Sequence, residues 1–488
     1  MFDDWNAIPK FVNVSAVDVI PSIFGYKEML FYRPLAQLYL YAVTLVFGPN
    51  PIPFHVLALF VHLINCLLIN SIMRHITGEA WLSALTGLIF SVSTAIHLDP
   101  LSWVVGIYDL GALLFFLLSF FFFIHERVWL STWMYFACAL FKESTIFLPI
   151  LYVVYIVLKH GRSNFKVNIK SLLPIFTVMV VFIFIRSIGL LHYYNTSFSR
   201  TYDINIHRYL QIWVNLCLYA KWMMQSILPF SFTDNLYFQW IFKFMSIILL
   251  CNFILLLVKK NMRNHLHPFF LLLFWMALGL LPVVFLQNRA YRYYAICSLP
   301  AFICFILYNF YLLCKFLRMK HILTTILLIV VSLSAVAFSL LQTHRIFREG
   351  LSQTILSDGT SFLIRRAMEV TIVQHGLKQS VPDLPPEAVL FFSGLDVYSF
   401  YKNSGPRFWY RQEGIRVYRL DVLRYENQKL YIESPIQDRL VLKKYNLDKK
   451  EYLDTSKVFA FQLSKNGEFT QLGIGQIIDV CVRQKNLQ

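Results

Sequence analysis

Long apolar runs recur along most of this chain, and they constrain its fold more than any other feature. From about Pro53 to Leu341 these runs reach membrane-spanning length and are separated by short polar connectors. After about Leu377, charged residues appear every few positions instead. A helix needs about 20 apolar residues to cross the hydrocarbon core of a bilayer. The sequence therefore predicts a polytopic α-helical membrane domain followed by a small water-soluble domain.

Composition supports this division and argues against a nucleic-acid-binding protein. The 488 residues are 57% hydrophobic and 15% charged, which is typical of membrane proteins. The formal charge is +17, but many of the Lys and Arg residues lie between apolar runs. Anionic lipid and the positive-inside rule favour cations at such positions. We therefore expect no nucleic-acid partner.

About ten stretches are apolar enough to be interpreted as spans. They are Pro53–Met73, Trp81–Ile96, Leu101–Ile124, Trp129–Phe141, Thr145–Leu158, Leu172–Ile188, Leu236–Val258, Pro268–Leu286, Tyr294–Leu313 and Ile322–Leu341. Only Lys142, Glu143 and Ser144 interrupt the stretch from Trp129 to Leu158, so this stretch is either one long helix or two short spans.

The distribution of positive charge decides between these two interpretations. The connectors richest in base are Lys159–Lys170, Lys259–Arg263 and Lys315–Lys320. All three fall on one side of the membrane only if the interrupted stretch crosses twice and Arg208–Phe230 lies along the outer surface. We therefore predict two short spans that meet at the outer face, basic loops in the cytoplasm, and both termini outside.

The start of the chain does not fit a simple topology. Residues before Pro53 form no clear span, and no signal-peptide pattern is present. The charge argument nevertheless places Asp3 and Asp4 outside. Either a short N-terminal tail is translocated whole, or a membrane helix precedes this sequence, and we favour the second.

Charged side chains gather at the predicted outer ends of the helices. An ionised residue at mid-bilayer costs about 2.5–3.5 kcal/mol on insertion scales, so such groups invite a functional interpretation. The clusters are Asp3-Asp4, Arg33-Pro34, His97-Leu98-Asp99 with Asp109 two to three turns further on, Lys142-Glu143, and Gln287-Asn288-Arg289 with Arg292-Tyr293-Tyr294. Carboxylates beside guanidinium and ammonium groups suit a site that holds a phosphate and abstracts a proton.

Each cluster also has a purely structural interpretation. Lys142 and Glu143 could pair with each other at a helix break. Asp99-Pro100 is a common entry to a first helical turn, so Asp99 could cap the following helix. Arg289 and Arg292 could extend to lipid head groups. The functional interpretation rests on the predicted location of all the clusters on the same side of the membrane more than on any single cluster.

The histidine and cysteine patterns give no metal site. His55 and His62 lie seven residues apart on one helical face, and we predict that they hydrogen-bond within the bundle. Seven of the eight Cys residues are in the membrane half, and only Cys481 is in the soluble tail. No CxxC or Cys/His ligand spacing occurs, so neither a structural zinc site nor a disulfide within the tail is expected.

Taken in order and spacing, several blocks resemble the protein O-mannosyltransferase superfamily and its bacterial relatives, which share the membrane glycosyltransferase fold called GT-C. These blocks are Phe2–Ile8 with its acidic pair, Tyr32–Leu35, Phe47–His55, His97–Asp99 with Val104–Gly106 and Asp109-Leu110, Phe141–Thr145, and Arg292–Tyr294 with Ser298–Pro300. The resemblance runs with gaps from residue 2 to about residue 300. It departs at Ile107, where the family often has Arg, and the tail lacks the tetratricopeptide helices of the animal members.

The resemblance implies transfer of a sugar from a polyprenyl-phosphate carrier to an acceptor hydroxyl on the outer face, with inversion at the anomeric carbon. Asp3 or Asp4 would be the catalytic base, with Asp3 the first choice, and Arg292 and Arg289 would neutralise the leaving phosphate. Sugar or acceptor would be positioned by Arg33, His97, Asp99, Asp109, Lys142 and Glu143. The phosphate is already a good leaving group, so no cofactor or metal is required, although a divalent metal stays open.

The implied partners are a polyprenyl-phosphate-linked sugar, a protein, lipid or glycan acceptor, and membrane lipids. We expect the inner, cytoplasmic membrane of a bacterium, with the active site and the C-terminal domain outside. The alternatives are a transporter or flippase and a non-catalytic binder of lipid-linked sugar. A transporter would distribute charges through mid-membrane positions and relate its halves by internal symmetry.

Three segments follow from this interpretation: residues 1–345 as the GT-C-like domain, 346–377 as a helical connector, and 378–488 as the extracytoplasmic soluble domain. We expect that domain to be β-rich or α+β and to span about 100 residues. The predicted strands are Ala388–Ser393, Phe408–Arg411, Ile415–Leu420, Lys429–Glu433, Leu440–Lys443 and Val458–Leu463. Lys465-Asn466-Gly467 is typical of a hairpin turn.

Overall fold

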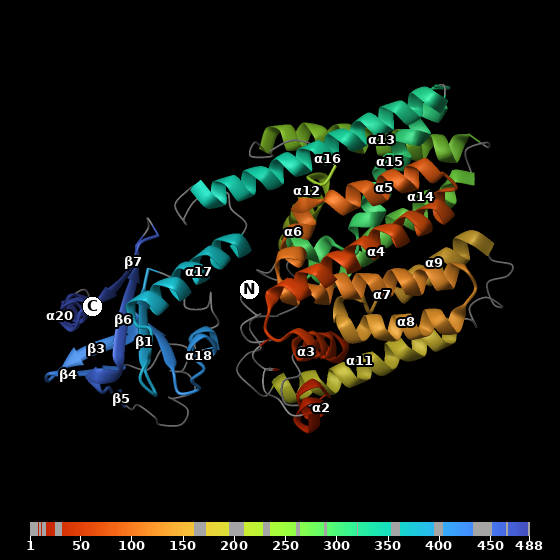
Figure 1. Cartoon of the computed structure of the whole chain (residues 1–488). Helices are drawn as coiled ribbons and strands as arrows, with labels where there is room; N and C mark the ends of the chain where they lie inside the picture. The colour runs from red at the N-terminus through yellow and green to blue at the C-terminus, as the bar shows by residue number, and fades with distance from the viewer. Residues whose placement is uncertain are drawn as a thin grey trace. The chain divides into compact units, whose positions relative to one another are not determined.

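A computed structural model of the chain describes residues 8, 11, 16–24, 32–160, 172–194, 209–227, 235–259, 264–286, 290–319, 321–352, 362–394, 404–432, 451–464 and 467–486. Asp3, Asp4, Arg289 and the predicted strand Leu440–Lys443 lie outside these residues. The chain divides into two compact units, one of Asn13–His344 and one that joins Met1–Val12 to Arg345–Gln488 (Figure 1).

The first unit is a helical bundle. Its elements are α2 (Ala16–Phe24), α3 (Pro34–Phe47), α4 (Pro51–Thr77), α5 (Ala80–Val92), α6 (Thr94–Ser102), η3 (Val104–Gly106), α7 (Ile107–Ile124), α8 (Val128–Phe141), η4 (Glu143–Thr145), α9 (Pro149–His160), α11 (Leu173–Tyr194), α12 (Tyr209–Met224), α13 (Asn235–Val258), α14 (Leu266–Val284), η8 (Arg292–Ala295), α15 (Leu299–Phe316) and α16 (His321–Ser352).

Local sequence signals set the ends of α4. The Asn50 side chain accepts a hydrogen bond from the Ile52 backbone N–H at 3.1 Å, and Pro51 occupies the first helical position. Both features are favoured at helix starts. At the other end Gly78 takes a φ of +75°, the left-handed conformation that commonly ends a helix. Helix α4, with 27 residues, therefore begins two residues before and ends four residues after the predicted stretch Pro53–Met73.

Large aromatic side chains fill the core between α7, α9 and α14. Phe116 and Phe120 each lie 5.4 Å from Trp275, measured between ring centroids, in edge-to-face arrangements. Phe120 also stacks on Tyr152. All four side chains are fully buried, and such ring pairs contribute about 0.5–1.5 kcal/mol beyond their buried area. This core holds α7, α9 and α14 in position relative to one another, and polar residues lie at the ends of these helices.

Five helices in the described residues are long and apolar enough to cross a membrane, or six if the bent pair α5 and α6 forms one span. The ten predicted spans are therefore not supported. Helix α8 has 14 residues and α9 has 12, which makes them about 21 and 18 Å long at 1.5 Å per residue, short of a core about 30 Å thick. The first unit nevertheless has the long apolar helices of a helical membrane protein.

The predicted break between α8 and α9 is present. Helix α8 ends at Phe141, and Lys142 takes an extended conformation. The 3₁₀ turn η4 follows before α9 begins at Pro149. Trp129–Leu158 is thus two helices and not one long helix.

The described part of the second unit contains both β-sheets and the α-helices α17, α18 and α20. Its elements are α17 (Phe362–Ser380), β1 (Val389–Ser393), α18 (Ser404–Tyr410), β2 (Arg416–Arg419), η10 (Leu420–Val422), β3 (Leu423–Glu426), β4 (Lys429–Ile432), β5 (Glu451–Tyr452), η11 (Thr455–Lys457), β6 (Val458–Leu463), β7 (Phe469–Leu472) and α20 (Ile474–Asn486). The first sheet has the order β2-β1-β6-β7 and the second the order β3-β4-β5.

Strand β1 is the centre of this unit. It pairs in parallel with β2 and β6, and β6 pairs antiparallel with β7. Side chains alternate along a strand, so Leu390 and Phe392 pack with α17 and α18, whereas Val389 and Phe391 pack with α20 and the second sheet. Burial on both faces explains why the strand has the continuous apolar sequence VLFF.

One predicted strand is wrong. Residues Phe408–Tyr410 belong to helix α18. Their aromatic side chains favour strands in general, but Ser404 begins the segment and Pro406 lies in its first turn, where proline is compatible with a helix. Trp409 packs in the core beneath β1.

Candidate functional site

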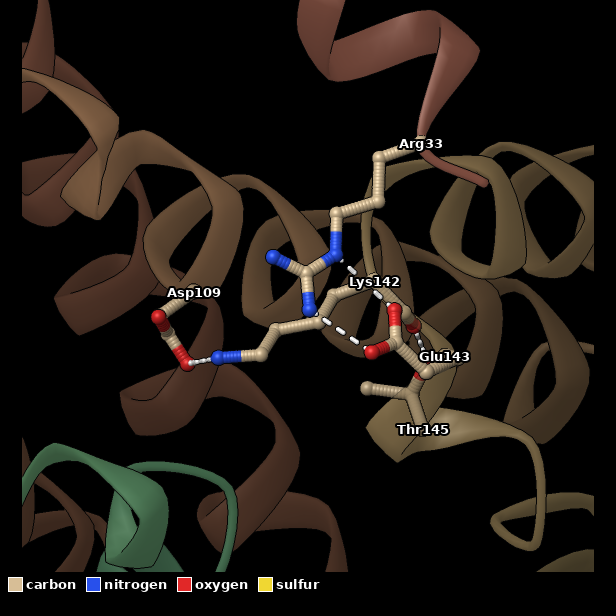
Figure 2. A network of polar contacts seen from close by, with 5 residues as sticks. All are labelled: Arg33, Asp109, Lys142, Glu143 and Thr145. Atoms are coloured by element: carbon tan, nitrogen blue, oxygen red, sulfur yellow. Dashed lines mark hydrogen bonds and ion pairs between the residues drawn. The ribbon is translucent and has the colours of Figure 1, made fainter. Parts of the chain in front are cut away.

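Two ion pairs lie side by side at one end of the helical bundle (Figure 2). The Arg33 guanidinium donates two hydrogen bonds to the Glu143 carboxylate, from Nε at 2.9 Å and from Nη2 at 2.6 Å. The Lys142 ammonium pairs with the Asp109 carboxylate. The exposed side-chain fractions are 15% and 26% for Arg33 and Glu143, but only 7% and 8% for Lys142 and Asp109. We call these four residues the charge-paired cluster.

The helix ends explain why these charges are tolerated in an apolar bundle. Asp109 lies in the first turn of α7, closer to the helix start than predicted, and Lys142 caps the C-terminus of α8. The helix macrodipole favours an anion at the first position and a cation at the second. A Cβ atom on Gly111 would lie 2.5 Å from the Phe141 ring, so this glycine lets α7 and α8 approach closely just beside the pair.

The backbone between α8 and α9 is held by hydrogen bonds from buried side chains. The Thr145 hydroxyl donates to the Lys142 carbonyl at 3.0 Å, and the Tyr135 hydroxyl donates to the Ile146 carbonyl at 2.6 Å. The turn therefore directs Lys142 toward α7 and Glu143 toward Arg33. The alternative that Lys142 and Glu143 simply pair with each other is wrong.

Aromatic rings connect the charge-paired cluster to η8. The Lys142 ammonium lies 5.3 and 5.1 Å from the ring centroids of Tyr293 and Tyr294, within the range of a cation–π interaction. The neighbouring Arg292 is exposed, and its guanidinium lies 6.0 Å from the ring of Trp222 on α12. The structure therefore brings two sequence clusters, Lys142-Glu143 and Arg292-Tyr293-Tyr294, to one place.

Helix α6, which carries His97 and Asp99, contacts both η8 and α12. The helix begins at Thr94, and Asp99-Pro100 lies inside it, so the predicted capping role of Asp99 is wrong. Asp99 is half-buried. The buried His97 bonds through Nδ1 to the Ser93 carbonyl at 3.0 Å. His97 thus packs within the bundle, and the structure does not bring it into the charge-paired cluster.

The predicted hydrogen bonding of the other two histidines within the bundle is confirmed. His55 Nδ1 bonds to the Leu101 carbonyl at 3.1 Å, and His62 Nε2 bonds to the Ser91 carbonyl at 3.0 Å. Among the described residues, no group of three or more His, Cys, Asp or Glu side chains is placed to hold one metal ion.

Three residues of the site were not predicted from the sequence. The Arg33 guanidinium lies 5.3 Å from the Tyr108 ring, and the Trp103 ring lies 6.0 Å from that of Tyr293. Arg186 on α11 is an electrostatic neighbour of Arg33 and Glu143. The sequence signal for Arg186 was its position inside an apolar run, where a charge is costly.

The Glu143 carboxylate is a weaker base than the carboxylate of a free glutamate. Burial favours the neutral form of Glu143, but the charge and hydrogen bonds of Arg33 outweigh this effect and hold its pKa at about 2. A group of such low basicity is a poor proton acceptor near neutral pH. Glu143 is therefore suited to holding geometry. Asp109 is suited to the same role because it is buried in its ion pair with Lys142, whereas the exposed Arg292 is suited to binding an anion.

These features define the class: the chain is a helical integral membrane protein with a polar, charge-paired site at one end of its bundle. Over 88 residues it is 34% identical to the human Protein O-mannosyl-transferase TMTC2. This similarity covers 18% of the chain, and the chain spans only 10% of the length of that relative. No protein-family profile matches the chain.

Proposed function

We propose that this protein is a glycosyltransferase that moves a sugar from a polyprenyl-phosphate donor to an acceptor hydroxyl at the outer face of the membrane, with inversion. The observation that carries the proposal is the juxtaposition of the charge-paired cluster with Arg292 at one end of an apolar bundle. A lipid-linked substrate arrives laterally from the bilayer with its phosphate at the interface, where such a site lies. The 88-residue similarity to an O-mannosyl-transferase supports the same class of reaction.

Arg292 is proposed to bind the donor phosphate, with Arg289 as a second cation. The Arg292 guanidinium is exposed, and the rings of Tyr293 and Tyr294 fix its short 3₁₀ helix against Lys142. Charge-assisted, bidentate hydrogen bonds suit a guanidinium to phosphate. Neutralising the phosphate as it leaves stabilises the transition state.

Asp3 or Asp4 is proposed to accept the proton of the acceptor hydroxyl. Two other candidates are disfavoured, because Glu143 has a very low pKa and Asp109 is buried against Lys142. Arg33, Asp109, Lys142 and Glu143 would then hold the sugar pocket in shape, with His97 and Asp99 positioning sugar or acceptor from α6. Neither a metal nor another cofactor is required in this proposal.

The proposed orientation has the charge-paired cluster outside and the basic helix ends in the cytoplasm. Exposed cations follow or end several helices at their other termini, among them Arg74 on α4, Lys159 on α9, Lys259 after α13 and Lys315 on α15. The positive-inside rule assigns such ends to the cytoplasm. The proposed location is the inner membrane of a bacterium, with residues 378–488 outside as an acceptor-orienting domain.

Labelling of single cysteines tests this orientation. In a variant without other cysteines, Glu413→Cys should react with a membrane-impermeant maleimide in intact cells, because its side chain is 97% exposed in the second unit. Lys259→Cys should react only after permeabilisation. Labelling of position 259 from outside would contradict the proposed topology.

Binding of the donor tests the role of Arg292. Arg292→Ala should weaken binding of a polyprenyl-phosphate sugar about 10- to 100-fold, since a hydrogen bond to a charged group contributes about 1.5–3 kcal/mol. Arg292→Lys keeps the charge without the planar fork and should have an intermediate effect. Titration of purified protein in nanodiscs measures both, with the exposed Arg127→Lys as control. Unchanged donor affinity in Arg292→Ala would remove this residue from the site.

The rival function is a transporter or flippase. The paired charges are gathered at one end of the bundle and are neutralised by one another, whereas a transport path needs polar groups near mid-membrane. Proteoliposomes with a fluorescent polyprenyl-phosphate sugar distinguish the two. A transporter would move the intact donor between leaflets without cleaving it.

A further inference from the structure

A second cluster of titratable side chains lies at the other ends of the helices that carry the charge-paired cluster, and the proposed reaction does not use it. Helix α7, which has Asp109 in its first turn, ends at Ile124 and is capped by His125. Around that end lie His75 near the C-terminus of α4, Tyr155 and Lys159 in the last turns of α9, and His267 in the first turn of α14. We call these last four residues and His125 the basic-end cluster.

Direct contacts connect the members of this cluster. His75 Nε2 lies 3.0 Å from the Tyr155 hydroxyl, and the rings of His75 and His125 are 6.0 Å apart. The Tyr155 ring lies 6.0 Å from that of His267 and 5.3 Å from the Lys159 ammonium. Tyr155 is buried, whereas His75, His125 and Lys159 are exposed. The arrangement is a rim of basic groups around one buried hydroxyl.

The basic-end cluster combines one ammonium group, that of Lys159, with three imidazoles and one phenol. Lys159 is an electrostatic neighbour of both His75 and His267. His125 is a further neighbour of His75, and His75 is a further neighbour of His267. Among the described residues, the electrostatic neighbours of His75 and His267 include no carboxylate. A bound anion would pair with the Lys159 ammonium and accept hydrogen bonds from the imidazole N–H groups around it.

A hydrogen-bonding atom is also available. His267 Nε2 is buried and has no hydrogen-bond partner among the described residues. A buried polar atom without a partner costs about 1–3 kcal/mol, and a ligand that reaches it removes this cost. The His267 ring lies 6.0 Å from the Tyr155 ring, which in turn lies 5.3 Å from the Lys159 ammonium, so polar groups of two helices are close to this nitrogen.

We infer that the basic-end cluster binds a phosphate-bearing anion, supplied by a lipid head group or by free phosphate. Lysine is a common point-charge binder of phosphate, and imidazole N–H and hydroxyl groups complete such sites. Basic pockets between transmembrane helices are known to hold anionic head groups on the cytoplasmic side. This site is separate from the proposed transfer site and does not depend on the proposed reaction.

The test compares two probes on the purified full-length chain. Native mass spectrometry in detergent measures binding of phosphatidylglycerol against phosphatidylcholine, and calorimetry measures binding of inorganic phosphate. A preference for phosphatidylglycerol identifies a head group as the ligand, and saturable binding of inorganic phosphate identifies free phosphate. If the wild-type protein shows neither, the inference is wrong.

Variants then assign the binding to the cluster. Lys159→Gln should weaken the observed binding about fivefold, and the Lys159→Gln, His75→Gln double variant about tenfold or more. Lys259→Gln is the matched control, because Lys259 is also exposed at a helix end and lies 4.3 Å from an aromatic ring, that of Phe316; it should change binding less than twofold. The single variant replaces an exposed side chain and keeps the fold, so wild-type affinity in Lys159→Gln would overturn the assignment.

Discussion

Lys142→Met should destabilise the helical unit by about 3–5 kcal/mol, because it leaves the Asp109 carboxylate buried without its cation. Only 8% of the Asp109 side chain is exposed, so water solvates the carboxylate poorly in place of the ammonium. Thermal unfolding of the purified protein in nanodiscs measures the effect as a lower midpoint. Lys259→Met, which removes an exposed lysine at a helix end, is the matched control and should shift the midpoint little.

A double variant separates the cost of an unpaired charge from the contribution of the pair. Replacing both partners, in Lys142→Met with Asp109→Leu, should recover most of the lost stability, since an apolar pair of similar volume often replaces a buried ion pair at little cost. If the double variant is as unstable as the sum of the two single variants, the residues do not act as a pair. Wild-type stability in Lys142→Met would show that Asp109 is not buried as described.

Asp3→Asn should lower the rate of sugar transfer about 10²- to 10⁴-fold, which is the usual contribution of a general base. Expression and donor affinity should stay near wild type, because in the proposal the donor phosphate is bound by Arg292. Single-turnover transfer with a labelled donor measures the rate, and Asp18→Asn, an exposed acid on α2, is the control.

Asp4→Asn completes this experiment, because the resemblance leaves either acid as the base. Loss of transfer in one of the two variants identifies the base. Full transfer activity in both would contradict the assignment and move attention to Asp99 and Glu143. Glu143 would then need a pKa far above the value of about 2 that Arg33 imposes on it.

The polar residues of the site could be predicted from the sequence, but their partners could not. Lys142 and Glu143 interrupt an apolar run, which was enough to predict a break. Their partners are 33 and 110 residues away along the chain, and no local pattern states which helix ends meet. The close packing at Gly111 and the turn at Thr145 decide this.

Span number was the least predictable part of the fold. Apolar composition predicts burial in lipid or protein, and it does not distinguish the two for helices as short as α8 and α9. In the second unit the core strands β1 and β6 were predicted closely, because each begins with four consecutive apolar residues. The strand β5 has only two residues, both exposed, and so leaves no signal in the sequence.

The central proposal, covalent sugar transfer from a lipid-linked donor, is tested most directly by following the fate of the donor. The purified chain in proteoliposomes would be given a polyprenyl phosphate labelled in its sugar, together with peptide, lipid and glycan acceptors. The proposal predicts that the label appears on an acceptor hydroxyl while unglycosylated polyprenyl phosphate accumulates in equal amount, and that Arg292→Ala reduces both. Donor that is bound or moved between leaflets but recovered intact, across a panel of sugars and acceptors, would contradict it.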